Sequence, residues 1–553
     1  MATTEYDAVV VGAGPNGLVA ANLLADAGLD VVVLEAQPEV GGAVRSARDV
    51  HPDYEHDTFS SFYPLAAASG AIGGLGLERH GLEWSHAPAV LGHPLPDGSW
   101  AMLHRDVDAT ARSLEALGSG DGDRWRAWVD DWRHVGDAMV DALTTPFPPL
   151  RAGARTLWAL RSVGGIDYVR RLLEPAAALG SDGFEGPGAG LLIAGNAAHA
   201  DIPADAAGSG LMGLLMTMLG QTVGFPVPRG GAGRLSAALA RRFASLGGDI
   251  RTSSRVDRVL LRDGRAVGVR VADGEVVTAR RAVVADVVAS SLYGDLIPEA
   301  ELPARLRRRM QRFQLDPGTI KVDWALDGPV PWSSPPDAPP GTVHLADSVS
   351  EIAETTAQIN AHTVPGEPFV LVGQMTTADP TRSPAGTEAL WAYAHVPQDV
   401  RHDAGGDRIT GRWDRDEVER FADRMQRRLE AHAPDLASRI VARRVLGPRE
   451  LEARDANLVG GAINGGTSAI HQQLVFRPVP GNGRASTPVP GLFLASASAH
   501  PGGGVHGAPG ANAARAVLAE PALLRRARPL VARLRRGDVP TLREGAPDDR
   551  RLT

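Results

Sequence analysis

The chain has 553 residues, which is too long for one hydrophobic core and predicts about three to four structural units. Hydrophobic residues make up 43% of it and charged residues 22%, a composition typical of soluble globular proteins. The net charge of −8 offers no electrostatic basis for binding nucleic acid. The chain has no cysteine, which excludes a redox-active disulfide, a thiolate nucleophile and a thiolate metal site. The histidines are scattered without ligand spacing, so we expect no metal site.

The N-terminus carries neither the basic nor the apolar region of a secretory signal. No apolar run approaches the ~18 residues of a membrane span. We therefore expect a cytoplasmic protein, and we leave open whether it is peripheral to a membrane.

A nucleotide-binding pattern begins the chain. Apolar strands at about residues 7–11 and 31–34 flank a glycine turn and a predicted helix at about residues 16–27. The first glycine permits the tight turn, the second lets the backbone approach a pyrophosphate, and the third lets the helix pack close to the strand. The helix N-terminus favours phosphate, and Glu35 at the tip of the second strand can accept hydrogen bonds from ribose hydroxyls. The turn, which predicts a dinucleotide site, reads Gly12-Ala13-Gly14-Pro15-Asn16-Gly17.

A second match to the glycine pattern spans Gly208–Gly213. It has no apolar strand before it and no acid where the ribose acid belongs. We interpret it as a place where helices pack closely. The sequence therefore offers no second nucleotide fold for NAD(P)H.

Later glycine segments favour FAD over a nicotinamide dinucleotide. NAD leaves such a fold after its pyrophosphate, whereas FAD is longer and stays buried, so other parts of the chain must approach it. Gly41 and Gly42 follow the ribose acid, with Arg45 close behind. Residues 228–236 form a glycine turn before a predicted helix, and residues 490–512 repeat strand, glycine loop and helix start. The dipole of that last helix, expected from about Ala513, could stabilise negative charge on a reduced flavin.

The segment GLFLASASAHPGGGVHGAPGANAARAV resembles the C-terminal FAD signature of the phytoene desaturase family, which also contains carotenoid isomerases and retinol saturase. DAVVVGAGPNG, VPRGGAGRLSAALARRF and the run from Gly460 to Pro478 fit the same family. Among its branches, the chain is most similar to the one named pyridine nucleotide-disulphide oxidoreductase domain-containing protein 2, although no cysteine is present for a disulfide. The resemblance covers about residues 5–520. Ser496 and Ser498 stand where relatives commonly have glycine, which puts contacts to the flavin chain in doubt.

This resemblance implies an α/β fold, with a discontinuous Rossmann-like FAD-binding domain, a mixed-sheet substrate domain and a helical insertion. The FAD-binding parts would be residues 1–70, 225–290 and 455–525. Residues 71–224, which include the helical insertion, and residues 291–454 would form the substrate domain. The backbone of Val256 would meet the adenine, and residues 526–553 would form a basic and polar tail. The residues expected to bind FAD are Gly12, Gly14, Pro15, Asn16, Gly17, Glu35, Gly41, Gly42, Arg45, Val256, Gly502, Gly503, Gly504 and Val505.

Helical periodicity dominates residues 105–215. Trp125, Trp128 and Trp132 recur on one face of a predicted helix. We interpret this stripe as core, with the arginines that follow it on the wet side. The alternative is an interfacial surface that dips into a bilayer to collect a lipid.

Strand patterns follow in the second half of the substrate domain. Residues 319–326 alternate like a half-buried strand, and residues 369–375 and 390–396 predict two more strands, which suggests a sheet over the flavin. Residues 412–432 predict a charged amphipathic helix with a solvated face. Residues 525–536 predict a basic surface helix before a fraying end.

A bound flavin would carry out the redox step, while the protein positions a C–H bond against N5 and excludes water. The catalytic residue stays unknown from the sequence. The candidates are His500 and His506, which flank the triple glycine, His471 in the preceding motif, and Lys321, the only lysine. A lysine holds a water near N5 in the related amine oxidases. Oxygen, a quinone or another acceptor is the simpler expectation for reoxidation.

We therefore expect an FAD-dependent oxidoreductase acting on a hydrophobic small molecule. Hydride would pass between a C–H of an unsaturated or isoprenoid lipid and flavin N5, with desaturation, saturation or isomerisation of a C=C bond. One alternative is a flavin amine oxidase, which predicts aromatic walls around the flavin, whereas 6 tyrosines and 11 phenylalanines are spread thinly. The other is a flavoprotein with structural FAD that acts as a binding partner.

Overall fold

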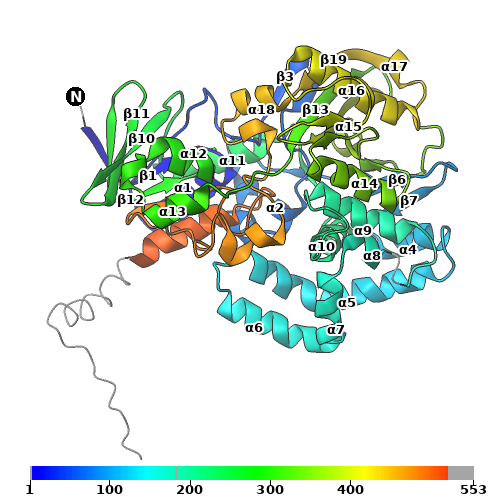
Figure 1. Cartoon of the computed structure of the whole chain (residues 1–553), viewed down its shortest axis with the longest axis horizontal. Helices are drawn as coiled ribbons and strands as arrows, with labels where there is room; N and C mark the ends of the chain where they lie inside the picture. The colour runs from blue at the N-terminus through cyan, green and yellow to red at the C-terminus, as the bar shows by residue number, and fades with distance from the viewer. Residues whose placement is uncertain (1–2, 181–182, 521–553) are drawn as a thin grey trace, which may run out of the picture.

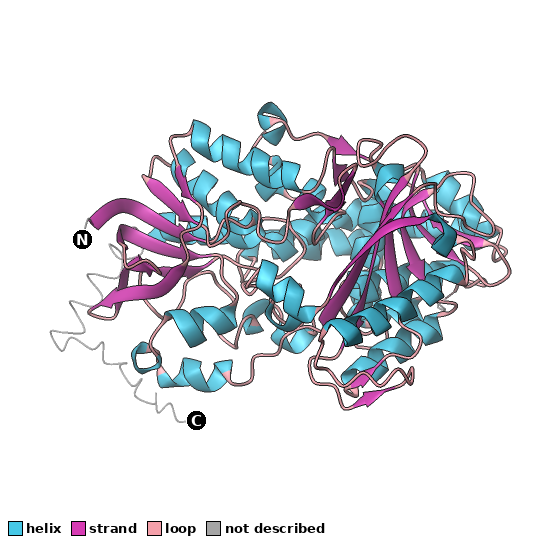
Figure 2. Ribbon diagram, turned by 90° about the horizontal axis from the view of Figure 1, so that it is seen from above, coloured by secondary structure: helices cyan, strands magenta, loops and turns pink. Residues whose placement is uncertain are grey.

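The computed structural model describes residues 3–180 and 183–520. Two large sheets lie toward opposite ends of the molecule with helices between them (Figure 1, Figure 2). The predicted C-terminal tail lies outside the described residues. No helix in the described part of the chain is long and apolar enough to cross a membrane.

The first sheet joins segments that are far apart in the sequence. Its strand order is β10-β11-β12-β1-β2-β9, and β20 pairs with β12. β1 lies parallel to both β12 and β2, and its central valines are fully buried, as expected for parallel strands covered on both faces. The strands are β1 (Thr3–Val11), β2 (Val31–Leu34), β9 (Asp249–Arg251), β10 (Val256–Arg262), β11 (Arg265–Val271), β12 (Val276–Ala285) and β20 (Leu492–Leu494).

Two helices cover one face of this sheet. α1 (Pro15–Asp26) and α11 (Gly233–Ser245) share a buried apolar cluster with β1 and β2. Residues 508–520 are also helical and contribute to that cluster. This last helix begins five residues before the expected Ala513. Its Gly510 lies directly on α1, because a Cβ there would be 1.9 Å from the Asn16 carbonyl oxygen.

The second sheet has the strand order β19-β13-β17-β16-β14-β6-β7. It is mixed, because β14 pairs with β6 in parallel and β13 pairs with β17 antiparallel. The predicted strands in residues 319–326, 369–375 and 390–396 are confirmed. The strands are β6 (Ala89–Pro94), β7 (Trp100–Leu103), β13 (Gly318–Leu326), β14 (Pro340–Leu345), β16 (Val370–Gln374), β17 (Glu388–Val396) and β19 (Ile440–Leu446).

Strand β13 is fully buried, so the expectation of a half-buried strand was wrong. Its apolar side chains pack against α16 (Arg415–Glu430), while Thr319, Lys321 and Asp323 alternate with them and are also buried. The alternation therefore separates an apolar face from a polar interior face, not from solvent. The predicted helix α16 is confirmed, but it is less solvated than expected, because even Arg424 is buried.

The helical insertion is confirmed. The stripe of Trp125, Trp128 and Trp132 is buried core. Gly210 and Gly213 belong to closely packed helices, because a Cβ on Gly213 would lie 2.6 Å from the Ile193 carbonyl oxygen. The helices are α4 (Val107–Glu115), α5 (Asp121–Thr144), α6 (Leu150–Ala159), α7 (Ile166–Leu173), α8 (Ala176–Leu179), α9 (Gly188–His199) and α10 (Ser209–Thr222).

Shorter elements connect these layers. The hairpin β3 (Ser46–His51) and β4 (Tyr54–Asp57) follows the Gly-Gly pair. The others are α2 (Pro64–Ala68), α3 (Gly70–Gly73), η1 (Leu77–His80), β5 (Trp84–Ser85), η2 (Leu160–Val163), β8 (Val227–Pro228), α12 (Ala289–Ser291), η3 (Leu292–Leu296), η4 (Glu299–Glu301), α13 (Ala304–Met310), α14 (Val349–Asn360), β15 (Thr363–Val364), α15 (Met375–Ala378), β18 (His402–Asp403), α17 (Leu436–Arg439), α18 (Pro448–Arg454), η5 (Val459–Gly461), η6 (Ile470–Gln472) and η7 (Leu474–Phe476).

Candidate functional site

The glycine turn joins β1 to α1, where the sequence predicted it. Gly12 has a φ of +96°, and a Cβ on Gly17 would lie 2.2 Å from the Gly12 carbonyl oxygen, so both positions require glycine. Gly14 is the N-cap of α1 and, as a glycine, provides no side-chain cap. Within residues 3–180 and 183–520, the backbone N–H groups of Gly14 and Asn16 have no hydrogen-bond partner. The helix N-terminus is thus open to an anion.

Glu35 lies at the end of β2, against the same turn. Its carboxylate accepts hydrogen bonds from the backbone N–H groups of Ala13, at 2.7 Å, and Gln37, at 2.8 Å. Burial raises the pKa of Glu35, although these two hydrogen bonds oppose the shift. Ser254 donates its N–H to the Glu35 carbonyl oxygen at 2.7 Å, which brings the start of β10 and buried Val256 beside this strand.

The Gly-Gly segment covers the other side of the turn. A Cβ on Gly42 would lie 3.1 Å from Gly14 Cα, so the two glycine segments are in contact. Arg45 donates to the carbonyl oxygens of Gly42, at 2.9 Å, and Arg454, at 2.7 Å. Arg45 therefore holds its own loop in place against α18.

A carboxyl group that the sequence reasoning missed lies at the centre of this region. Asp286 Oδ2 accepts a hydrogen bond from the Gly17 N–H at 2.8 Å. Burial, together with the charges of Asp455 and Glu35, raises the pKa of Asp286 to about 8, despite that hydrogen bond. One signal could have found it. Asp286 directly follows β12, and the carboxyl ends of parallel strands share the edge of the sheet where ligands bind.

The triple glycine lies between the last strand and the last helix. Gly502 and Gly504 have positive φ values of +119° and +112°. Gly503 does not, but a Cβ there would lie 2.6 Å from Asn464 Oδ1. A Cβ on Gly504 would likewise collide with the Leu65 side chain, and Val505 is half-buried beside the loop.

The two histidines that flank this loop contact the backbone. His506 Nδ1 accepts a hydrogen bond from the Ala508 N–H at 3.1 Å, at the start of the last helix. His500 Nε2 lies 3.1 Å from the carbonyl oxygen of Thr145, at the end of α5. Burial lowers the pKa of both, for His506 to about 4. His471 lies on an exposed turn and contacts Gln314 at 2.9 Å.

A buried charge of each sign holds the loop at residues 463–467. Asp316 accepts hydrogen bonds from the N–H groups of Ile463, at 2.6 Å, and Asn464, at 2.8 Å. Arg477 donates to the carbonyl oxygens of Asn464, at 2.6 Å, and Ala497, at 2.9 Å. Arg477 stood in a motif of the resemblance without a role, and nothing in the sequence marked Asp316. The pair joins this loop to the strand that leads into the triple glycine.

Lys321 projects from the polar face of β13. Its ammonium forms an ion pair with Asp323 and lies 5.7 Å from the centre of the Trp391 ring. Asp323 also pairs with Arg444 at 2.7 Å. Burial lowers the pKa of Lys321, and the charge of Asp323 opposes that shift. The ammonium is thus engaged with Asp323 and with neither glycine loop.

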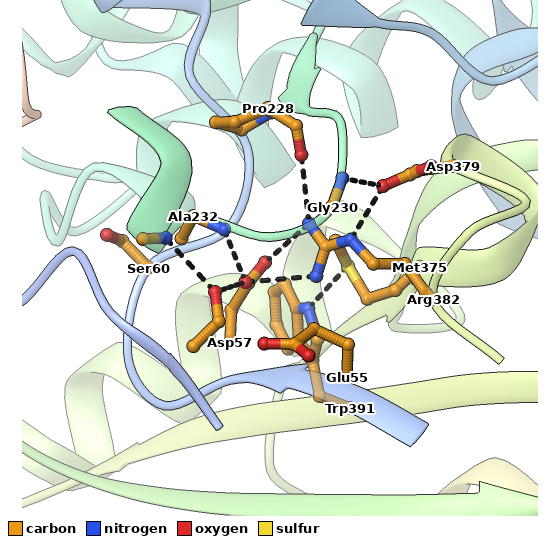
Figure 3. A network of polar contacts seen from close by, with 12 residues as sticks. Glu55, Asp57, Ser60, Pro228, Gly230, Ala232, Met375, Asp379, Arg382 and Trp391 are labelled. Atoms are coloured by element: carbon orange, nitrogen blue, oxygen red, sulfur yellow. Dashed lines mark hydrogen bonds and ion pairs between the residues drawn. The ribbon is translucent and has the colours of Figure 1, made fainter. Parts of the chain in front are cut away.

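A buried arginine connects the two sheets (Figure 3). Arg382 donates to both carboxylate oxygens of Asp57, at 3.0 and 3.1 Å, and to Asp379 at 2.9 Å. Asp379 accepts the N–H of Gly230 at 2.7 Å, and Asp57 accepts that of Ala232 at 2.7 Å. The predicted glycine turn before α11 is thereby tied to the connection between β16 and β17 of the second sheet and to the hairpin β3–β4.

Aromatic rings gather on the polar face of the second sheet. Trp391 and Tyr393 stack with their centres 5.7 Å apart, and Phe62 lies 6.2 Å from Trp391. Folding therefore brings Phe62 beside a ring pair from a distant segment of the chain. No group of side chains suited to a metal ion occurs in the part of the chain that the structure describes.

Comparison with known proteins shows what the chain is similar to. Residues 10–70 match the family described as NAD(P)-binding Rossmann-like domain, and residues 161–386 match flavin containing amine oxidoreductase. The chain is 28% identical to pyridine nucleotide-disulfide oxidoreductase domain-containing protein 2 of Mus musculus, over 93% of each protein. It is 25% identical to one of the subunits of limonene dehydrogenase from Castellaniella defragrans, over 93% of this chain and 94% of that protein.

Two further similarities concern a desaturase and the fold. Phytoene desaturase of Fusarium fujikuroi is 24% identical over 91% of this chain and 87% of that protein. A putrescine oxidase structure superimposes with a TM-score of 0.60 and 19% identity, covering 94% of this chain and 100% of that one. At this identity the structure speaks for the fold alone.

Proposed function

We propose that this FAD-dependent oxidoreductase, which is similar to the phytoene desaturases, acts on an unsaturated or isoprenoid lipid. Hydride passes between a C–H group of the lipid and N5 of FAD, so that a C=C bond is introduced, saturated or isomerised. One observation carries the proposal. The limonene dehydrogenase protein and phytoene desaturase, both named for dehydrogenation of an isoprenoid, align with 93% and 91% of the chain.

The glycine segments fit FAD. The open N–H groups of Gly14 and Asn16 suit a pyrophosphate, and Glu35 retains acceptor capacity for ribose hydroxyls. Gly42 lies on Gly14, where a side chain would fill the approach. We propose that residues 1–70, 225–290 and 455–525 form the FAD-binding domain. The contacts would come from Gly12, Gly14, Pro15, Asn16, Gly17, Glu35, Gly41, Gly42, Arg45, Val256, Gly502, Gly503, Gly504 and Val505.

When bound, FAD accepts or donates the hydride at N5. The chain orients the lipid, excludes water and shapes the loop at residues 502–504. We propose that His500 and His506 hold this loop and transfer no proton, because each is engaged with the backbone. Lys321 is likewise assigned to the buried charge network with Asp323.

An exposed apolar surface supports contact with a membrane. On α6 and α7, Leu157, Trp158 and Ile166 are 68%, 73% and 79% exposed. Arg151 and Arg161 lie among them, and no described carboxylate pairs with either. The two helices lie at the lower edge of the molecule in Figure 1. We propose that this surface, called the α6–α7 surface below, rests on a lipid interface from which the substrate is taken, as amphipathic helices with arginine and tryptophan do.

A flavin amine oxidase is the second candidate, favoured by the stacked pair Trp391–Tyr393. The experiment that separates the candidates starts with lipid extraction of the purified holoprotein and mass spectrometry of the extract. The identified lipid and a panel of amines are then mixed anaerobically with the holoprotein. Bleaching of the flavin by the lipid supports the proposal, and bleaching by an amine supports the second candidate. A flavin that reacts with neither, in either redox state, indicates a structural cofactor.

A further inference from the structure

Two buried histidines and a half-buried one form a hydrogen-bonded row on the polar face of the second sheet. His344 Nδ1 lies 3.2 Å from His93 Nε2, and His344 Nε2 lies 3.2 Å from His199 Nδ1. His93 and His344 come from the adjacent strands β6 and β14, and His199 ends α9. Burial lowers the pKa of His93 to about 3 and that of His199 to about 4, and burial and its two neighbours keep the pKa of His344 well below 6.5. The row is therefore neutral at physiological pH.

His93, at the inner end of the row, determines which ring nitrogen of each histidine carries the proton. A neutral histidine has one N–H, so the two N···N hydrogen bonds must run the same way. His93 Nδ1 is buried and has no hydrogen-bond partner among the described residues. If that nitrogen carried the proton, a buried N–H donor would be left without an acceptor. This costs more free energy than leaving an unprotonated ring nitrogen without a donor. The protons therefore lie on His93 Nε2 and His344 Nε2, and His199 carries its proton on Nε2.

The outer end of the row meets a second donor. Tyr393 lies beside His199, with 6.3 Å between ring centres. Neither His199 Nε2 nor Tyr393 Oη has a hydrogen-bond partner in residues 3–180 and 183–520, and both residues keep part of their surface accessible. Burial holds the pKa of Tyr393 well above 10, so its hydroxyl stays protonated. Two neutral donors thus lie on adjacent rings at this point of the polar face.

This point is linked to the triple glycine by contacts. The ring of His395 lies 5.3 Å from that of Tyr393, and His395 forms an ion pair with Asp201. Asp201 accepts a hydrogen bond from the side-chain amide of Asn464, which lies against Gly503. No hydrogen bond joins Asp201 to His199 or Tyr393 in the described residues, so the donors of these two side chains remain for a ligand.

We propose that His199 and Tyr393 bind a carbonyl or carboxylate oxygen of the substrate, with His344 and His93 holding the proton of His199 on Nε2. The substrate is then an oxygenated lipid and not a pure hydrocarbon. This inference rests on the proposed function, since it places the ligand beside the loop at residues 502–504. It adds a substrate class to that function.

The test measures binding to the FAD-loaded protein by the change in flavin absorbance. Farnesal, farnesoic acid and the hydrocarbon farnesene share one carbon chain and differ in oxygen content. We expect the two oxygenated compounds to bind roughly tenfold more tightly than farnesene, as two added hydrogen bonds allow. Tyr393→Phe and His199→Leu should remove this preference.

A glycine pair on α9 tests the histidine row itself. A Cβ on Gly195 would lie 2.7 Å from both His344 Nδ1 and His93 Nε2, whereas a Cβ on Gly190 meets only Val349 Cγ2 at 3.3 Å as its nearest atom. Gly195→Ala should weaken the preference for farnesal, and Gly190→Ala should retain it. Nitrogen NMR of ¹⁵N-histidine-labelled protein, with His199 assigned through His199→Gln, should find the proton on Nε2.

Two results would overturn the inference in distinguishable ways. If farnesene binds as tightly as farnesal, or if His199 carries its proton on Nδ1, the oxygen site is wrong while the lipid function stands. If none of the three compounds perturbs the flavin, the proposed isoprenoid lipid fails and the oxygen site fails with it.

Discussion

Buried carboxyl groups surround the glycine turn, and each has a different task. Glu35 stays at the end of β2, where the sequence predicted a ribose acid. Asp286 accepts a hydrogen bond from the N–H of Gly17. The raised pKa of Asp286 is unexpected, because a carboxylate at a helix N-terminus is ordinarily stabilised in its charged form. Burial near Asp455 and Glu35 outweighs that effect.

Asp286 should make stability depend on pH. Its pKa is about 8 in the folded protein against 3.8 for the unperturbed group. Between these values the folded state holds a proton that the unfolded state has lost, so the free energy of unfolding falls as the pH rises from about 4 to about 8. Denaturant unfolding of FAD-free protein across this range should find a shallower slope in Asp286→Asn. Asp123→Asn, at an exposed site, is the control, and an unchanged slope in Asp286→Asn would contradict the assignment.

Gly503 should not tolerate a side chain. Gly503→Ala places a Cβ 2.6 Å from Asn464 Oδ1, so the loop must shift, and we expect a folded protein with weakened FAD binding and altered flavin absorbance. Gly73→Ala is the control, because nothing lies within 4 Å of its Cβ position. Parent-like FAD affinity and spectrum in Gly503→Ala would show that this loop does not border the flavin.

At the scale of elements, local patterns predicted more than long-range contacts did. The strand, glycine turn and helix of residues 7–27 were predictable because burial and glycine spacing are encoded locally. The glycine segments were predictable through the resemblance. The partners of those segments were not, because Asp286, Asp316 and Arg382 act on loops that are far away in the sequence. The full burial of β13 was also hidden, since polar side chains can line an interior face.

Arg382 should be essential to the junction between the sheets. Removing it leaves Asp57 and Asp379 buried without their cation, which costs about 3–5 kcal/mol in comparable cases. We therefore expect Arg382→Met to lose that much in denaturant unfolding. Arg229→Met removes an exposed ion pair with Glu83 in the same part of the chain and should cost at most about 1 kcal/mol. Equal losses of unfolding free energy in the two variants would show that Arg382 does not hold this junction together.

The α6–α7 surface should bind lipid vesicles. Flotation with vesicles of phosphatidylcholine and phosphatidylglycerol should recover the parent protein, and high salt should reduce recovery because exposed arginines are screened. Trp158→Gln/Ile166→Gln removes two large apolar side chains from the surface, so recovery should drop several-fold. Leu246→Gln/Val441→Gln removes exposed apolar side chains elsewhere and should leave recovery unchanged. Equal recovery of both double variants would assign the surface no membrane role.

The whole molecule combines a sheet that carries the glycine turn with a second sheet whose inner face is polar and aromatic. The described residues contain one strand–glycine–helix arrangement that is followed by a strand ending in an acid, because the second glycine match lies within packed helices. The electrons should therefore enter or leave through the lipid and an acceptor such as oxygen or a quinone, and not through NADPH.

Anaerobic mixing of the FAD-loaded protein with its co-purifying lipid tests the central claim most directly. We predict that the lipid bleaches oxidised flavin or reoxidises photoreduced flavin, and that mass spectrometry finds the lipid changed by a pair of hydrogen atoms; an isomerisation would instead move a C=C bond without a change of mass. NADPH should leave the flavin oxidised under the same conditions. A protein that binds no FAD, or a flavin that NADPH reduces rapidly while the lipid leaves both redox states untouched, would contradict the claim.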